Sequence, residues 1–153
     1  MSEVDQMPGH LIRRFQQIAV AIFHAEVAKT GIDLTPVQYA AMAKIAEIDG
    51  VDQATLAGLI AYDRATITGV VDRLVQKGYI ERVVSTRDRR ARELHLTDKG
   101  RDTFAKVSPA VQQAQQSMLA GLDGEEQSEL LRLMAKAIDA GNEQSRAPLK
   151  SNS

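Results

Sequence analysis

The sequence predicts a mainly helical protein that carries one small β-hairpin. Three observations support this fold class. Apolar residues recur at helical spacing through most of the chain. Two short runs of alternating character, "YIERVV" and "RELHL", interrupt that pattern. Hydrophobic residues make up 44% of the 153 positions, which is enough to bury the core of one domain. We therefore expect residues 1–153 to form a single unit.

Start signals place the first two helices. An amphipathic pattern predicts a long helix over residues 8–29. After a break, Thr35 is placed to cap a second helix, with Pro36 at its first position. Gln38 has the spacing that completes a capping box, and the helix is expected to run to about Ile48.

Two closely spaced helices are predicted next. Asp52 caps a short helix that ends near Ile60, and Asp63 caps another that ends before Gly78. The apolar positions of the second helix follow the i, i+3, i+4, i+7 rule and should face the core: Ile67, Val70, Val71 and Leu74. Its other face has small residues such as Ala65 at its centre, so the helix backbone can approach a partner closely.

The two alternating runs form a hairpin whose tip is residues 86–91. Thr97 then caps a further helix, and Asp123 opens the last one, so that residues 98–141 are helical apart from the break between them. The polar segment 142–153 is expected to be a disordered tail.

Positive charge is concentrated in one part of a nearly neutral chain. Residues 64–101 hold ten lysines and arginines and five acids, about +5, whereas the whole chain is at -1 and the remainder is therefore at about -6. Four arginines fall within residues 87–92, at the hairpin tip. Such a local footprint steers a polyanion to one surface.

The order short helix, tight turn, helix and hairpin predicts a winged helix-turn-helix over residues 35–97. In that architecture the second helix, the recognition helix, enters the major groove of DNA, and the hairpin, the wing, lies beside the minor groove. The predicted DNA-binding residues are Arg64, Ala65, Thr66, Thr68 and Arg73 in the recognition helix and Arg87, Asp88, Arg89, Arg90 and Arg92 in the wing.

Simpler explanations exist for some of these residues. A charged hairpin tip is often only a solvated turn, Arg64 is an exposed first-turn position, and Thr66 and Thr68 suit any helix surface. Asp72 would repel phosphate, so we expect it to pair with an arginine, either Arg73 or a wing residue.

Residues 52–100 resemble the DNA-binding lobe of the MarR family of bacterial transcriptional regulators. The resemblance rests on "VVDRL", on the Asp-x-Arg pair of Asp88 and Arg90, and on the "LT..G" that closes the hairpin. It implies that Arg90 reaches into the minor groove while Asp88 orients it. It also implies a homodimer, with residues 8–29 and 98–141 as dimerisation helices, acting as a repressor that a small aromatic anion releases from DNA.

The resemblance implies a ligand site where the first, second and fifth helices meet. The candidates there are Arg14 for a carboxylate, His10 or Tyr39 for a ring substituent, and Gln38 for a hydrogen bond. Alternatives remain, since Arg14 fits an intersubunit ion pair, Gln38 the capping box and Tyr39 the core. The stretches "PGHLIRRFQQ" and "LTPVQYAAM" resemble the branch that regulates aromatic and nicotinate catabolism.

Several classes of function are not expected. The chain has no cysteine, and its three histidines lack the spacing of a metal site, so neither a metal nor another cofactor is predicted. We find no nucleophile motif or phosphate-binding glycine loop, which argues against an enzyme. Without a long apolar run or a secretory signal, a cytoplasmic location away from the membrane is expected.

The leading hypothesis is a homodimeric regulator that binds a pseudo-palindromic duplex and responds to a small aromatic acid. The alternatives are a helical module whose basic hairpin binds an acidic protein, and an enzyme that turns over an aromatic acid. Competition by duplex DNA with a steep salt dependence distinguishes the first from the others.

Overall fold

The structure is a computed structural model that describes residues 2–150; residues 1 and 151–153 lie outside the described part. Its elements, in chain order, are η1 (Glu3–Gln6), α1 (Pro8–Ala28), α2 (Pro36–Glu47), β1 (Val51–Asp52), α3 (Gln53–Leu59), α4 (Arg64–Gln76), β2 (Ile80–Val84), β3 (Arg92–Leu96), α5 (Asp98–Met118), α6 (Gly124–Gly141) and η2 (Asn142–Gln144). The predicted fold class is confirmed.

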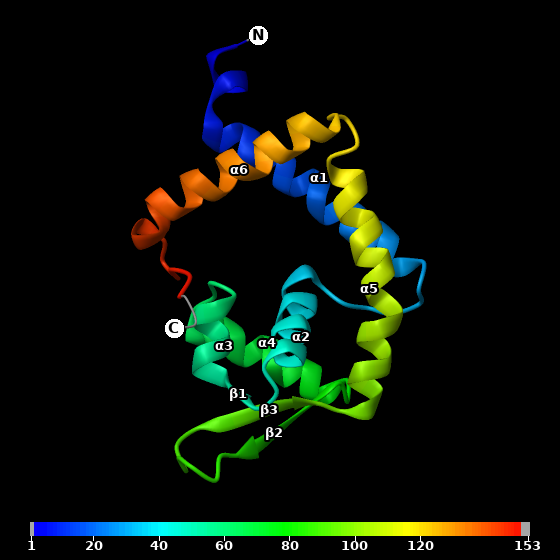
Figure 1. The fold of residues 1–153 in the computed structure, drawn as a ribbon, viewed down its shortest axis with the longest axis vertical. Helices are drawn as coiled ribbons and strands as arrows, with labels where there is room; N and C mark the ends of the chain where they lie inside the picture. The colour runs from blue at the N-terminus through cyan, green and yellow to red at the C-terminus, as the bar shows by residue number, and fades with distance from the viewer. Residues whose placement is uncertain (1, 151–153) are drawn as a thin grey trace.

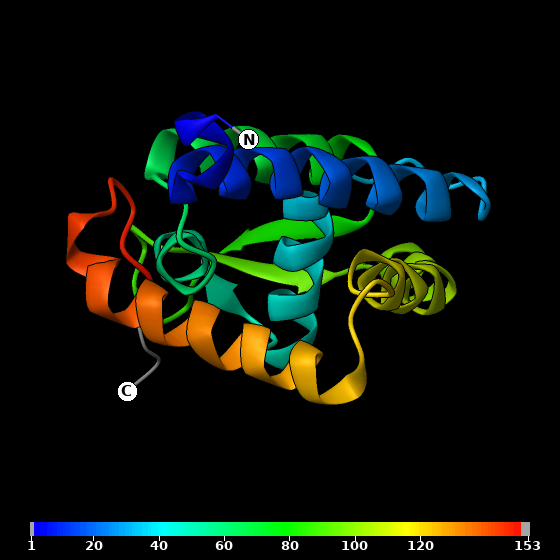
Figure 2. The ribbon, with the colours of Figure 1, turned by 90° about the horizontal axis from the view of Figure 1, so that it is seen from above.

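A compact lobe of α2, α3, α4 and the sheet lies below α1 and α6, and α5 runs down along its side (Figure 1). Helices α1 and α5 pack side by side, and α6 turns back from the end of α5 above the lobe. Figure 2 shows that α1 and α6 run along opposite sides of the molecule. The lobe is therefore held between α5 at its side and the layer of α1 and α6 above it.

Local capping fixes where the helices begin. At every predicted N-cap the side chain accepts a hydrogen bond from the backbone N–H three residues on, as expected for Thr35, Asp52, Asp63, Thr97 and Asp123. The capping box of α2 is also present. Helix α4 ends where predicted, because Gly78 adopts a φ of +79°, in the left-handed region that glycine tolerates best.

The sheet is antiparallel, with strand order β1-β3-β2. The predicted hairpin of β2 and β3 is confirmed, with Ile80 opposite Leu96 and Val84 opposite Arg92. The third strand was not predicted. Strand β1 is only two residues long and pairs Val51 with Leu94. Two residues are too few to show the alternation of apolar and polar side chains that marks a strand in the sequence.

The core lies mainly in the lobe, continues into α1 and α5 through Phe23, Val27, Val107 and Val111, and orients α4. Ile67, Val71 and Leu74 are buried as predicted, against Leu56 of α3 and Leu94 of β3. Since one face of α4 is fixed by this packing, its opposite face is held toward solvent.

The expected disorder of residues 142–153 is wrong for residues 142–150. The Asn142 side chain donates to the carbonyl of Leu149 at 3.0 Å and accepts from its N–H at 2.9 Å. The N–H of Lys150 donates to the Gly58 carbonyl at 2.9 Å. These bonds close the segment into a loop on α3, which composition alone does not reveal; residues 151–153 lie outside the described residues.

Candidate nucleic-acid interface

The outer face of α4, the wing and the start of α3 line a common hollow of about 720 Å³, called here the wing hollow. Its lining residues are Asp52, Gln53, Ala54, Arg64, Ile67, Thr68, Arg82, Asp88, Arg90, Ala91 and Arg92. The fold therefore brings together two candidates from α4 and three from the wing. The remaining candidates, Ala65, Thr66, Arg73, Arg87 and Arg89, are exposed outside this lining.

The first turn of α4 is held by its N-cap. The Asp63 carboxylate accepts from the Thr66 N–H at 2.8 Å and from the Thr66 hydroxyl at 3.1 Å. These bonds lower the pKa of Asp63 below its ordinary value, so its carboxylate stays negative at neutral pH. Thr66 is thus engaged with the cap on its own helix, while Arg64 extends into solvent beside it.

Ser85 and Asp88 shape the wing tip. Ser85 is buried, and its hydroxyl oxygen accepts from the N–H groups of Arg87, at 3.1 Å, and Asp88, at 3.3 Å. Asp88 in turn accepts from the backbone N–H of Arg90 at 2.9 Å. Asp88 therefore positions Arg90 through its backbone, and the guanidinium of Arg90 has no hydrogen-bond partner among residues 2–150.

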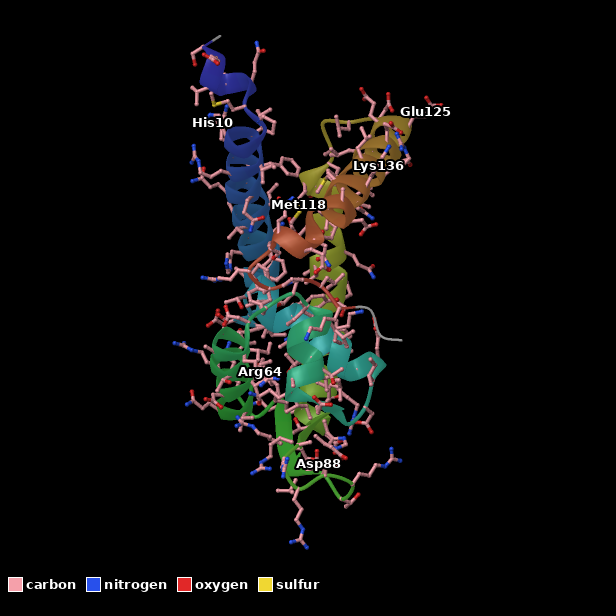
Figure 3. The ribbon with its side chains drawn as sticks, turned by 90° about the vertical axis from the view of Figure 1, so that its left-hand side faces the viewer. His10, Arg64, Asp88, Met118, Glu125 and Lys136 are labelled. Atoms are coloured by element: carbon pink, nitrogen blue, oxygen red, sulfur yellow. The ribbon has the colours of Figure 1, made fainter. Side chains whose placement is uncertain are left out.

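The wing arginines differ in their contacts. Arg92 donates to the Arg89 carbonyl at 3.2 Å, so it braces the tip from within. Arg87 and Arg89 are exposed, and Figure 3 shows the tip, with Asp88 labelled, at the far end of the molecule from His10. Positive side chains thus project from the end of the lobe that carries the wing.

The pairing expected for Asp72 is confirmed, with a wing residue as its partner. Asp72 of α4 accepts a hydrogen bond from the guanidinium of Arg82 in β2. The ion pair ties the wing to the recognition helix and removes an unpaired carboxylate from the basic surface.

Three residues that shape the candidate interface were not predicted from the sequence. Arg82 joins α4 to the wing, and Ser85 folds the tip; a Ser-x-x-Asp turn signal was available for Ser85. Gln53 of α3 donates to the Thr68 hydroxyl at 3.1 Å, and that hydroxyl donates to the Arg64 carbonyl at 2.8 Å. Gln53 had no sequence signal, because only the packing of α3 against α4 brings it there.

Gln38 and Tyr39 have structural partners. The Gln38 side chain is buried and accepts from the Thr35 N–H and from the Lys77 ammonium, both at 3.2 Å. The Tyr39 hydroxyl donates to Ser108 at 3.2 Å, and its ring stacks on Phe104 with centroids 5.2 Å apart. The capping and core contacts considered for these two residues are therefore present.

His10 and Arg14 lie elsewhere, on the solvent-exposed N-terminal half of α1. The His10 ring lies 3.3 Å from the guanidinium of Arg13, and Figure 3 places it far from the lobe. A single chain thus divides the four candidate ligand residues between the start of α1 and the start of α2.

A helix-turn-helix completed by a hairpin wing and a short third strand defines a winged-helix protein. The model of the MarR family matches residues 34–91. The regulator HosA of Escherichia coli O111:H- is 30% identical over 131 residues, covering 86% of this chain and 94% of HosA. The chain belongs to the MarR family and is a MarR-type transcriptional regulator. The repressor NicR of Pseudomonas putida is 28% identical over 138 residues, covering 90% of this chain and 86% of NicR.

Solved structures agree over nearly the whole chain. PcaV of Streptomyces coelicolor, in complex with its natural ligand, has a TM-score of 0.84 at 30% identity, covering 92% of this chain and 98% of PcaV. BpsR of Bordetella bronchiseptica, whose DNA binding is regulated by 6-hydroxynicotinic acid, has a TM-score of 0.84 at 27% identity, covering 91% and 98%. The repressor CouR, bound to a 23-mer DNA duplex, has a TM-score of 0.79 at 29% identity, covering 91% and 96%.

Within residues 2–150 we find neither a membrane-spanning helix nor a cluster of metal-binding side chains. No helix within residues 2–150 has the length and hydropathy needed to cross a membrane. Over the same residues, no group of three or more histidine, aspartate or glutamate side chains is arranged to hold a metal ion.

Proposed function

We propose that this regulator binds duplex DNA with α4 in the major groove and the wing in the adjacent minor groove. The observation that carries the proposal is the wing hollow, where Arg64 and Thr68 of α4 meet Arg90 of the wing on one basic surface. Arginine at a narrow minor groove gains from its enhanced negative potential.

The contacts divide by chemistry. Arg64, Ala65, Thr66 and Thr68 lie on the first turns of α4 and are assigned to base edges and the neighbouring backbone. Arg73, Arg87 and Arg89 are assigned to phosphates, and Arg90 to the minor groove. Asp88 and Arg92 hold the tip in shape through the backbone contacts described above.

The long helices supply a dimer interface. Four apolar side chains of α1 and four of α6 are exposed in the single chain: Leu11, Ile12, Phe15 and Ile18, and Leu131, Leu133, Met134 and Ile138. Such faces mark an interaction site in a folded protein. A two-fold dimer that covers them presents two recognition helices to half-sites about 10 bp apart on a pseudo-palindrome.

The effector we propose is a small aromatic or N-heteroaromatic carboxylate, and the regulated genes those for its catabolism. BpsR is regulated by such an acid, and NicR is named as a repressor. We assign Arg14 to the carboxylate, His10 or Tyr39 to a ring substituent, and Gln38 to a hydrogen bond, with the dimer bringing the two regions together. Because the ligand shifts an equilibrium only by differential affinity, it must bind the DNA-incompetent arrangement more tightly.

The test is binding of the purified protein to duplex DNA from upstream of its own gene, titrated with benzoate, hydroxybenzoates and pyridine carboxylates. The expected result is tight, salt-sensitive binding that one compound releases. If neither this DNA nor any duplex from an unbiased selection binds, the DNA-binding proposal fails, and the protein-binding module takes its place. Chemical conversion of the added acid would instead point to an enzyme.

Effector binding has a separate test in Arg14→Ala. The variant should bind DNA as the unchanged protein does but need at least about tenfold more effector for release, since a charged hydrogen bond contributes about 1.5–3 kcal/mol. Arg132→Ala, which removes an exposed arginine of α6 paired with Glu129, is the matched control. An Arg14 variant with unchanged release would remove Arg14 from the site.

A further inference from the structure

The C-terminal segment is attached to the helix-turn-helix. From the end of α6 it descends to α3 (Figure 1), where the N–H of Lys150 donates to the Gly58 carbonyl at 2.9 Å. A Cβ atom at Gly58 would lie only 3.0 Å from Cδ and 3.2 Å from Cβ of Lys150. The absence of a side chain at Gly58 therefore makes room for the stem of Lys150, and the Asn142–Leu149 hydrogen bonds hold the loop closed.

The same segment places a cation beside the recognition helix. The guanidinium of Arg146 lies 3.5 Å from the Asp63 carboxylate, the N-cap of α4. Asp63 is needed to start the helix, but its negative charge lies at the end that approaches DNA in this architecture. Arg146 offsets that charge, and because 89% of its side chain stays exposed, its other N–H groups are free to bind an anion.

The segment also extends the DNA-facing surface. A second hollow, of about 470 Å³, lies between residues 146–150 and the turn from α3 to α4. It shares Ala54 and Arg64 with the wing hollow, so the two are contiguous around Arg64. Arg146 and Lys150 line the second hollow. Positive charge thus continues from the wing, across the start of α4, to the C-terminal segment.

We propose that residues 145–150 are a third DNA-contacting element, in which Arg146 and Lys150 bind backbone phosphate beside the first turn of α4. The inference rests on the proposed function and adds to it a contact outside the helix-turn-helix and wing. The contacts are with phosphate because both side chains are long and extend from a loop, which fits charge neutralisation better than reading of base edges.

The experiment compares operator binding by the full-length protein and by Arg146→Ala, Lys150→Ala and the double variant over a range of salt concentrations. Each substitution should weaken binding to all duplexes by up to about tenfold and reduce the slope of log K against log salt by about one for each phosphate that is no longer bound. Lys136→Ala, on an exposed position of α6, is the matched control and should keep the original slope.

A second variant separates attachment from charge. Gly58→Leu fills the space of the Lys150 stem and should displace the segment while keeping every cation, so its slope should fall as in the double variant. Thermal unfolding checks that each variant is folded. If the double variant kept the salt slope of the unchanged protein, or if Gly58→Leu bound DNA more tightly, this inference would be overturned while the proposed function would stand. Failure of the unchanged protein to bind any duplex would overturn the proposed function and this inference with it.

Discussion

At the scale of single residues, the arginines of the wing look alike in the sequence but make different contacts in the structure. Arg82 is bound to Asp72, and Arg92 to the backbone of the tip, so both are partly used in holding the wing. Arg90 is fixed only through its N–H by Asp88. Its guanidinium can therefore enter a groove without breaking an internal contact.

Arg90→Ala should weaken binding to specific and unrelated duplexes alike and flatten the salt dependence by about one unit of slope. The measurement is fluorescence anisotropy at several salt concentrations, with Lys136→Ala as a control away from the lobe. If affinity fell for one DNA sequence only, and the slope of log K against log salt did not change, Arg90 would not have the sequence-independent minor-groove role assigned to it.

His95 forms a charged cluster at the base of the wing. Its Nδ1 lies 2.7 Å from Asp49 and its Nε2 3.6 Å from Glu93, and Glu81 lies opposite on β2. The hydrogen bond with Asp49 is the main reason that the pKa of His95 is raised, while partial burial opposes the shift. Since the folded pKa exceeds the unfolded one of about 6.5, this stabilisation is complete below pH 6.5 and is lost as pH rises through the folded pKa.

Asp49→Asn should therefore reduce the free energy of unfolding more at about pH 5.5 than at about pH 8. Denaturant unfolding at the two values measures the difference. Asp33→Asn, at an exposed carboxylate 3.9 Å from Lys77, is a control that lacks a histidine partner. An equal loss for Asp49→Asn at both pH values would show that His95 does not gain a proton from this contact.

At the scale of elements, one junction sets the position of the wing. The Thr97 hydroxyl donates to the Gly78 carbonyl at 2.6 Å and accepts from the Gly100 N–H at 2.9 Å. The Thr97 N–H donates to the Tyr79 carbonyl at 3.0 Å. These bonds connect the end of α4, the hairpin and the start of α5, which gives the "LT..G" signal a structural meaning.

Gly100→Ala should destabilise the fold by about 3 kcal/mol, because the added Cβ would overlap the Tyr79 carbonyl oxygen and lie 2.8 Å from its carbon. Backbone has to move to relieve this overlap. Gly69→Ala is the matched control, since a Cβ there meets nothing within 4 Å, and it should stabilise helix α4 by about 0.5–1 kcal/mol. Equal thermal midpoints for the two variants would contradict the close approach at Gly100.

At the scale of the whole molecule, a single chain leaves the apolar faces of α1 and α6 exposed to solvent. Helix α6 has no buried residue, and the buried residues of α1, Phe23 and Val27, lie at its C-terminal end. Helix formation by such an exposed amphipathic segment depends on packing its apolar face. The proposed dimer supplies that packing and also fixes the separation of the two recognition helices.

Phe15→Glu and Ile138→Glu should each reduce the mass in light scattering from twice 16.7 kDa to 16.7 kDa, because a charge cannot be buried unpaired in the interface. Operator affinity should fall at least about a hundredfold when two half-sites are no longer bound together. Val75→Glu, at an exposed apolar position of the lobe, is the control and should remain dimeric. Unchanged mass in both interface variants would place the dimer contact elsewhere.

Local rules determined the helices, the hairpin and the basic footprint. N-caps such as Asp63, the apolar spacing of α4 and the arginines of the wing are short-range features, and each has a local physical cause. They were sufficient to predict the fold class and to select a candidate DNA-binding surface. They also predicted an arginine partner for Asp72, either Arg73 or a wing residue, and the structure shows that the partner is Arg82 of β2.

Only the tertiary structure decided which residues meet across the chain. Strand β1, the position of Gln53 beside Thr68, the core contacts of Tyr39 and the attachment of Arg146 to Asp63 all join segments that are distant or unpatterned in sequence. The physical reason is that capping and periodicity act over a few residues, whereas these contacts depend on how the packed core orients separate elements.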